Sequence, residues 1–128
     1  MRPAGLGPLG PVASVPSISS TFSACGSWAT LSAVVTPFTR DSHTMVYDPV
    51  RDRLLIFGGI SGTGDFTNDV WALSLGGTPT LTQVTTSGTP PPARQETAAI
   101  YDPGRDRLVI FSGHGSSGEL NDVWALSL

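Results

Sequence analysis

Charged residues are scarce in this chain: Asp, Glu, Lys and Arg make up only 13% of its 128 residues, about half the share of a typical soluble domain. Seven basic and ten acidic residues give a net charge of −3. So little positive charge provides no electrostatic footprint for nucleic acid or for an anionic membrane surface. Neither is therefore expected as a partner.

Cysteine is nearly absent as well. The single Cys25 can form neither an internal disulfide nor a cysteine-based metal site. The two histidines, His43 and His114, show no metal-ligand spacing, and no apolar run approaches the roughly 18 residues of a membrane-spanning helix. The sequence therefore predicts no metal, no cofactor and no membrane span.

Glycine and proline are abundant, with 15 and 11 residues, which is typical of short strands joined by turns. They are dense in residues 1–27, which we predict to be an irregular Pro/Gly/Ser-rich arm. Residues 22–25 faintly resemble a lipoprotein cleavage box, but proline and glycine interrupt the apolar stretch that a signal peptide requires. The sequence alone therefore leaves the compartment unknown.

Residues 28–128 contain two copies of one sequence unit. The segment 47–57 returns as 101–111 with nine of eleven positions identical, and 68–75 returns unchanged as 121–128. The copies are offset by 54 and 53 residues, close to the period of about 50 residues that a propeller blade requires.

Each copy is interpreted as antiparallel strands with no helical period. The first copy predicts four strands, at 43–47, 54–57, 70–75 and 81–85. The second copy supplies the equivalents of the first three, and a further strand is expected near Trp28. The fold class is therefore all-β, with eight strands that amount to two four-stranded antiparallel blades.

These motifs resemble the kelch family. The resemblance rests on an apolar strand that ends in Gly-Gly, an Asn-Asp-Val-Trp segment and a connection, 37–43, that carries an arginine and a histidine. Ser112 replaces Gly58 in the second copy, and Leu81 takes the place of Trp28. The residues expected to have structural roles are Trp28, Gly58, Gly59, Trp71, Gly113 and Trp124. The resemblance implies part of a kelch-type β-propeller.

Three features recur in both copies, and the first two each allow two roles. Trp71 and Trp124 are expected to be largely buried between blades, with ligand stacking as the alternative. Arg40 and Arg94 either hydrogen-bond neighbouring carbonyls or recognise an anion or carboxylate. The charged runs at 51–53 and 105–107 are expected to be solvated turns with local ion pairs.

Two blades are too few to close a ring, because propellers have about four to eight. The chain should therefore leave strand edges and apolar faces open. Either further kelch repeats complete the propeller, so that this chain is a fragment, or several copies self-associate into a ring.

The function favoured by the sequence is a non-catalytic binding scaffold. Loops on a rigid scaffold usually carry recognition, and the expected loops at 60–67 and 114–120 lie at the same end as the connections between copies. The candidate contacts to a protein or carbohydrate ligand are Arg40, Asp65, Phe66, Arg94, His114 and Glu119.

Two alternatives remain open. The resemblance includes kelch-fold copper oxidases and sugar epimerases. However, Cys25 lies outside the repeats, both tyrosines occupy repeated structural positions, and no nucleophile–base pair is recognisable. We therefore expect no enzyme. The chain could also be a structural segment of a larger surface protein, and an extracytoplasmic location follows from the family resemblance alone.

Overall fold

The computed structural model describes residues 26–31 and 39–128, and the described part is all-β with ten strands and no helix. Residues 1–25 and 32–38 lie outside the description. Cys25, most of the predicted N-terminal arm and the start of the 37–43 connection therefore lie outside the described residues.

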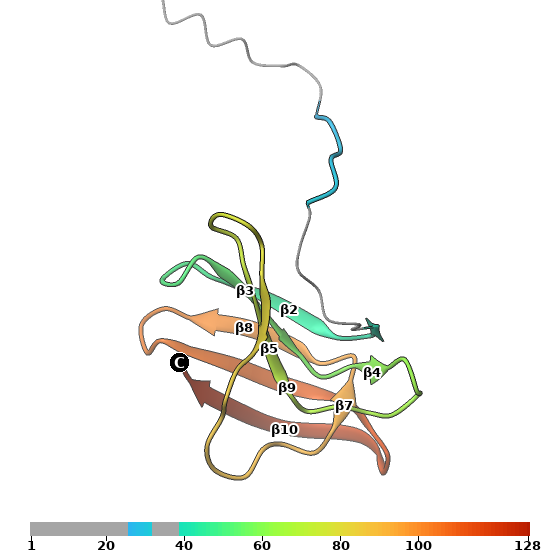
Figure 1. Cartoon of the computed structure of the whole chain (residues 1–128). Helices are drawn as coiled ribbons and strands as arrows, with labels where there is room; N and C mark the ends of the chain where they lie inside the picture. Colours follow the sequence, from blue (N-terminus) through green and yellow to red (C-terminus); the bar gives the residue numbers. More distant parts are fainter. Residues whose placement is uncertain (1–25, 32–38) are drawn as a thin grey trace, which may run out of the picture.

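The first copy forms a complete four-stranded antiparallel sheet, which we call blade 1 (Figure 1). Its strands follow the chain in the order β2 (Thr44–Asp48), β3 (Arg53–Phe57), β5 (Val70–Ser74) and β6 (Leu81–Gln83). Asp48 shapes the first turn, because its carboxylate accepts the backbone N–H groups of Val50 and Arg51 at 3.1 and 3.2 Å, an Asx turn. These four strands confirm the sequence prediction for this copy.

The second copy forms blade 2, in which β8 (Ala98–Asp102), β9 (Arg107–Gly115) and β10 (Gly118–Ser127) lie side by side. In the described part of the chain, no further strand pairs with the outer edge of β10. The far end of β9 also pairs with the short β7 (Arg94–Gln95). Blade 2 therefore has only the first three strands of the repeat, as predicted.

Each copy begins with the same broken strand. β1 (Arg40–Asp41) pairs with β4 (Ile60–Ser61) and precedes β2, as β7 precedes β8. The breaks occur at Ser42 and Glu96, which have positive φ angles of 51° and 54°. Non-glycine residues rarely adopt this conformation, and its recurrence shows that the break is part of the repeat.

Two predictions about strands are corrected. Trp28 is fully exposed, and residues 26–31 form no strand, because no strand edge of the described chain lies beside them. Residues 114–120 are not a loop. β9 and β10 extend through them and form a hairpin that turns at Ser116 and Ser117, because the shorter connection in this copy lets the two strands keep pairing.

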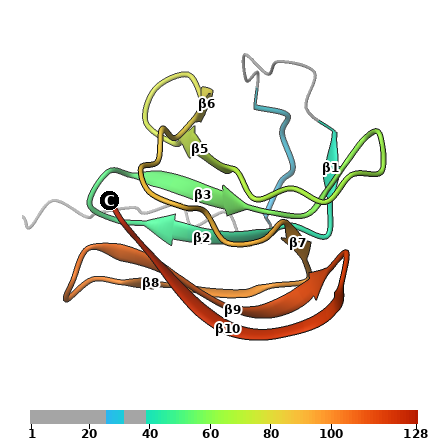
Figure 2. The ribbon, with the colours of Figure 1, turned by 90° about the horizontal axis from the view of Figure 1, so that it is seen from below.

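The two blades stack face to face, with the core between them (Figure 2). Side chains alternate across each strand, so one face of each blade supplies the core, which contains Leu55, Phe57, Val70, Ala72, Leu108 and Ile110. Trp124 packs against this cluster. Trp71 and Trp124 are only partly buried, contrary to prediction, because each N–H reaches a partly exposed carboxylate.

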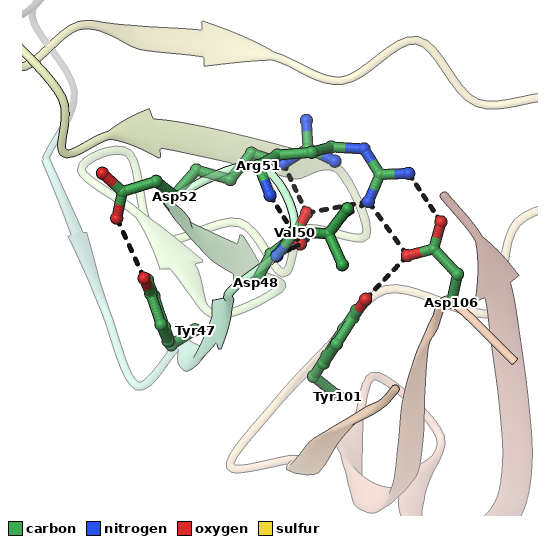
Figure 3. A network of polar contacts seen from close by, with 8 residues as sticks. Tyr47, Asp48, Val50, Arg51, Asp52, Tyr101 and Asp106 are labelled. Atoms are coloured by element: carbon green, nitrogen blue, oxygen red, sulfur yellow. Dashed lines mark hydrogen bonds and ion pairs between the residues drawn. The ribbon is translucent and has the colours of Figure 1, made fainter. Parts of the chain in front are cut away.

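A polar contact joins the blades at the turns between their first and second strands (Figure 3). The guanidinium of Arg51 donates two hydrogen bonds to the carboxylate of Asp106, at 2.9 and 2.6 Å. Arg51 also donates to Asp48 at 3.2 Å, and the Tyr101 hydroxyl donates to Asp106 at 2.7 Å. The sequence predicted only local ion pairs in these turns. That prediction is incomplete, because one pair crosses between the copies.

This contact changes the acidity of its carboxylate. The hydrogen bonds from Arg51, and then that from Tyr101, lower the pKa of Asp106 from its ordinary value of 3.8 to about 2. Hydrogen bonding to the charged form favours that form. A carboxylate with a depressed pKa in the folded state stabilises the fold above its ordinary pKa, and this stabilisation is lost as the pH falls through the folded-state value.

We therefore predict that the stability of the blade pair falls between pH about 4 and about 2 in part through Asp106. The urea midpoint should be measured over this range for the parent and for Asp106→Asn. The variant should show a shallower fall, because it has no carboxylate to protonate. Arg51→Gln should also flatten the curve, and an unchanged slope in both variants would contradict the assignment.

Candidate functional site

Three of the connections between strands meet at one end of the blade pair, which we call the loop end (Figure 1). It comprises the β3–β5 connection (58–69), the β6–β7 connection (84–93) and the β9–β10 hairpin. The backbone N–H of Arg94 donates to the carbonyl of Thr67 at 3.0 Å, and the Asn68 amide donates to the carbonyl of Pro91 at 2.8 Å. Contacts between the two copies therefore hold the loops.

Buried arginines support this end in both copies. Arg94 has no exposed surface, and its guanidinium donates to both carboxylate oxygens of Asp122 and to the carbonyl of Ser112. Arg40, whose side chain is 6% exposed, pairs with Asp69 in the same bidentate way. A buried charge requires such a partner.

A tryptophan completes each arginine pair. The indole N–H groups of Trp71 and Trp124 donate to Asp69 and Asp122, each at 2.6 Å. Burial raises the pKa of Asp69, but the hydrogen bonds from Arg40 and Trp71 outweigh it and hold the pKa below its ordinary value. Arg94 and then Trp124 lower the pKa of Asp122 in the same way. Both carboxylates are thus held charged.

The geometry favours the structural role of the two arginines. A ligand cannot touch Arg94, because its side chain is fully buried, and this corrects its assignment as a binding residue. Arg40 is almost as enclosed. Their partners, Asp69 and Asp122, were not predicted from the sequence. The signal was present, because an aspartate two residues before the tryptophan recurs in both copies.

Glycines allow the backbone to pack closely beneath the loops. A Cβ atom at Gly59, where φ is 94°, would lie 2.4 Å from the carbonyl oxygen of Asp41. Gly58 and Gly113 are similarly crowded, by Arg94 and by Thr97 and Gln95. Glycine is therefore needed at these positions because neighbouring atoms leave no room for a Cβ atom.

Three of the predicted binding residues come together across the two copies. The rings of Phe66 and His114 lie 6.0 Å apart at a tilt of 55°, and Nδ1 of His114 lies 3.1 Å from a carboxylate oxygen of Glu119. We call these three residues the aromatic patch. Glu119 is 85% exposed and His114 is 39% exposed, so the patch is accessible.

Asp65 lies beside the patch, next to Phe66 in the β3–β5 connection. Its carboxylate accepts the hydroxyl hydrogen of Thr63 at 2.7 Å, and its backbone N–H donates to the hydroxyl oxygen of Ser61 at 3.2 Å. The Asp65 side chain is nevertheless exposed. The loop is thus ordered by its own hydrogen bonds while it keeps a carboxylate available.

The loop end is acidic. Its two arginines are paired with Asp69 and Asp122, and its other carboxylates are exposed, on Asp41, Asp65, Glu96 and Glu119. The remaining arginines of the described chain, at 51, 53, 105 and 107, lie in the turns at the opposite end. A chain with a modest net charge therefore concentrates its negative charge at one end.

Other kinds of site find little support in the described residues. In residues 26–31 and 39–128, no three His, Cys, Asp or Glu side chains gather as metal ligands. A cavity of about 80 Å³ lies between the blades beneath the β6–β7 connection, with mainly apolar walls that include Phe57, Leu108 and Trp124. It is too small for a drug-sized ligand, since such pockets measure about 300 Å³ or more.

Over the same described ranges, no helix has the length and apolar character to cross a membrane.

Comparison with known proteins agrees with this geometry. The family model described as the KLHDC2/KLHL20/DRC7 Kelch-repeats domain matches residues 22–128. The chain is also 36% identical to dynein regulatory complex subunit 7 of Chlamydomonas reinhardtii over 91 residues. That alignment covers 70% of this chain but only 8% of the relative. The chain belongs to the kelch-repeat family, and the sequence-based assignment is confirmed.

Two glycines of the β3–β5 connection allow a matched prediction about the support of the site. Gly59→Ala and Gly64→Ala both place alanine at a φ near 90°, but a Cβ at Gly64 meets nothing within 4 Å. Gly64→Ala should cost about 1–2 kcal/mol for the backbone conformation alone. Gly59→Ala should cost about 1–3 kcal/mol more, because Asp41 must move. Urea unfolding measures both, and equal costs would contradict the close approach.

Proposed function

We propose that this kelch-repeat chain is a non-catalytic protein-binding scaffold whose loop end recognises a basic segment of its partner. The observation that carries the proposal is the aromatic patch, flanked by exposed carboxylates that no arginine of the described chain neutralises. Complementary charge steers association and selects the partner. An acidic surface of this kind favours lysine- and arginine-rich ligands.

The aromatic patch suits the same ligand. A lysine or arginine placed over the face of an aromatic ring such as Phe66 is attracted by the ring quadrupole, worth about 0.5–1 kcal/mol at an exposed site. Glu119 and Asp65 lie close enough to the rings to pair with neighbouring cations of the same segment. The aliphatic stems of long basic side chains would also pack against the rings.

The support beneath the patch makes it suitable for recognition. The 84–93 connection, which is fastened through Arg94, is hydrogen-bonded to the β3–β5 connection that carries Phe66. His114 stands on the extended β9–β10 hairpin. A surface ordered before binding loses less conformational entropy when a partner arrives.

A binding role also fits the residues that could have served chemistry. The hydroxyls of Tyr47 and Tyr101 donate to Asp52 and Asp106, at the end opposite His114. The tyrosines and the described histidines are therefore kept apart. The Chlamydomonas relative is, by its name, a subunit of a complex, which agrees with a scaffold.

The proposal is tested with two synthetic peptides, one in which lysine and arginine alternate with leucine and one in which glutamate replaces the cations. Fluorescence anisotropy should show binding of the basic peptide alone, weakening as salt rises. Asp65→Asn with Glu119→Gln should weaken it by about tenfold, because two exposed pairs contribute up to about 1 kcal/mol each.

The matched control is the pair Asp52→Asn and Asp102→Asn at the opposite end, which removes the same charge and should leave the affinity nearly unchanged. Phe66→Ala should weaken binding without altering its salt dependence. Equal loss in the loop-end and control variants would mean that only net charge matters, and this would overturn the proposed site. Binding of neither peptide would overturn the choice of a basic ligand.

A further inference from the structure

The turns at the end opposite the loops carry the same five polar residues in each copy: Tyr47, Asp48, Arg51, Asp52 and Arg53 recur as Tyr101, Asp102, Arg105, Asp106 and Arg107. Their internal contacts recur too. The tyrosine hydroxyl donates to the carboxylate five residues later, at 2.9 and 2.7 Å. The last arginine donates through Nε to the first aspartate, at 2.8 and 2.9 Å.

Within the chain, the two sets are joined in one direction only. Arg51 of the first copy reaches forward to Asp106 of the second, whose carboxylate Tyr101 also holds (Figure 3). We call this arrangement the latch. It consists of a donor half, the arginine, and an acceptor half, the tyrosine with its aspartate.

Each copy therefore has one half of a latch left over. In the described chain, the Asp52 carboxylate accepts from Tyr47 and meets no arginine. Arg105 contacts Asp102 at 3.3 Å, and its side chain is 69% exposed. In the described chain, the acceptor half of the first copy and the donor half of the second therefore have no partner in the other copy.

The apolar surfaces show the same relation. Strand register places Ile100, Phe111 and Val123 on the outer face of blade 2, and all three are exposed. Their equivalents in the first copy are Val46, Phe57 and Val70, which pack in the core between the blades. The outer face of blade 2 therefore carries the same repeat positions as the face of blade 1 that packs against blade 2.

The opposite outer face fits this surface. Register places Met45 and Tyr47 of blade 1 on its outer side, where both are exposed. Their equivalents are Ala99, which packs against the core, and Tyr101, which holds the latch. The two outer faces of one chain are thus the two sides of the contact that the chain makes internally.

We infer that the outer faces are a docking surface for a second copy of this chain, added head to tail, with Arg105 of one copy bound to Asp52 and Tyr47 of the next. The occupant follows from complementarity in charge and shape, because the same pair already joins the two blades. The contact is heterologous, so repeated addition forms a ring if the rotation closes and an open chain if it does not.

The test is a charge swap read by light scattering and sedimentation over a range of concentrations. The parent should associate beyond a monomer, and more weakly as salt rises. Arg105→Asp or Asp52→Arg alone should weaken association by about fivefold or more, since reversal replaces an exposed ion pair by repulsion. Each variant keeps the internal Arg51–Asp106 latch.

Mixing the two variants separates a specific contact from a general charge effect. The aspartate introduced by Arg105→Asp then faces the arginine introduced by Asp52→Arg on the other chain. The second interface keeps its natural pair, so the mixture should associate like the parent. The double swap in one chain should recover as well. Ser117→Arg, at the exposed tip of the β9–β10 hairpin, is the control and should leave the association unchanged.

Some results would overturn the inference. A parent chain that stays monomeric at every concentration would exclude a second copy as the occupant. Association that neither swap weakens, or that the mixture fails to restore, would exclude the latch. These outcomes leave peptide binding at the loop end unaffected, so the two proposals fail separately.

Discussion

The buried guanidinium of Arg94 is the feature on which the loop end depends. A buried arginine without a partner costs several kcal/mol, so its position requires Asp122 from β10 and the carbonyl of Ser112 from β9. The same residue brings the β6–β7 connection across from blade 1, where its backbone meets Thr67 and Gly59. One neutralised charge therefore holds strands of both copies and the loops above them.

The two ends of the blade pair use the arginine–aspartate pair in different ways. At the loop end the pairs are enclosed and satisfied within each copy, and no arginine of the described chain pairs with the exposed carboxylates beside them. At the opposite end the pairs are partly exposed, and Arg51 crosses from one copy to the next. Exposed pairs are weak and sensitive to salt, whereas enclosed pairs are much less so. The pairs that support the fold thus lie at the loop end, and the pairs suited to reversible contact lie at the opposite end.

The strands of the repeat could be predicted, but some details of their ends could not. Strands were predicted correctly from the apolar run 54–57 and from the identical segments 68–75 and 121–128. The pattern that indicates a strand lies in consecutive residues, so the local sequence contains it. The stretch 114–120 looked like a glycine-rich loop, yet β9 and β10 pair through it. Trp28 matched a family position but has no described strand beside it. Pairing depends on the neighbouring strand, which the local sequence does not contain.

For this protein, the sequence by itself determined the all-β class, the two-copy organisation, the family and the glycines of the close approach, because each follows from local periodicity or direct identity. The tertiary structure decided which charges meet. Only stacked blades bring Phe66 to His114, enclose Arg94 with Asp122 and place Arg51 on Asp106 rather than within its own turn. Such contacts join residues 28 to 55 positions apart or lie between copies, and electrostatic energy depends on distance in space, not on distance along the chain.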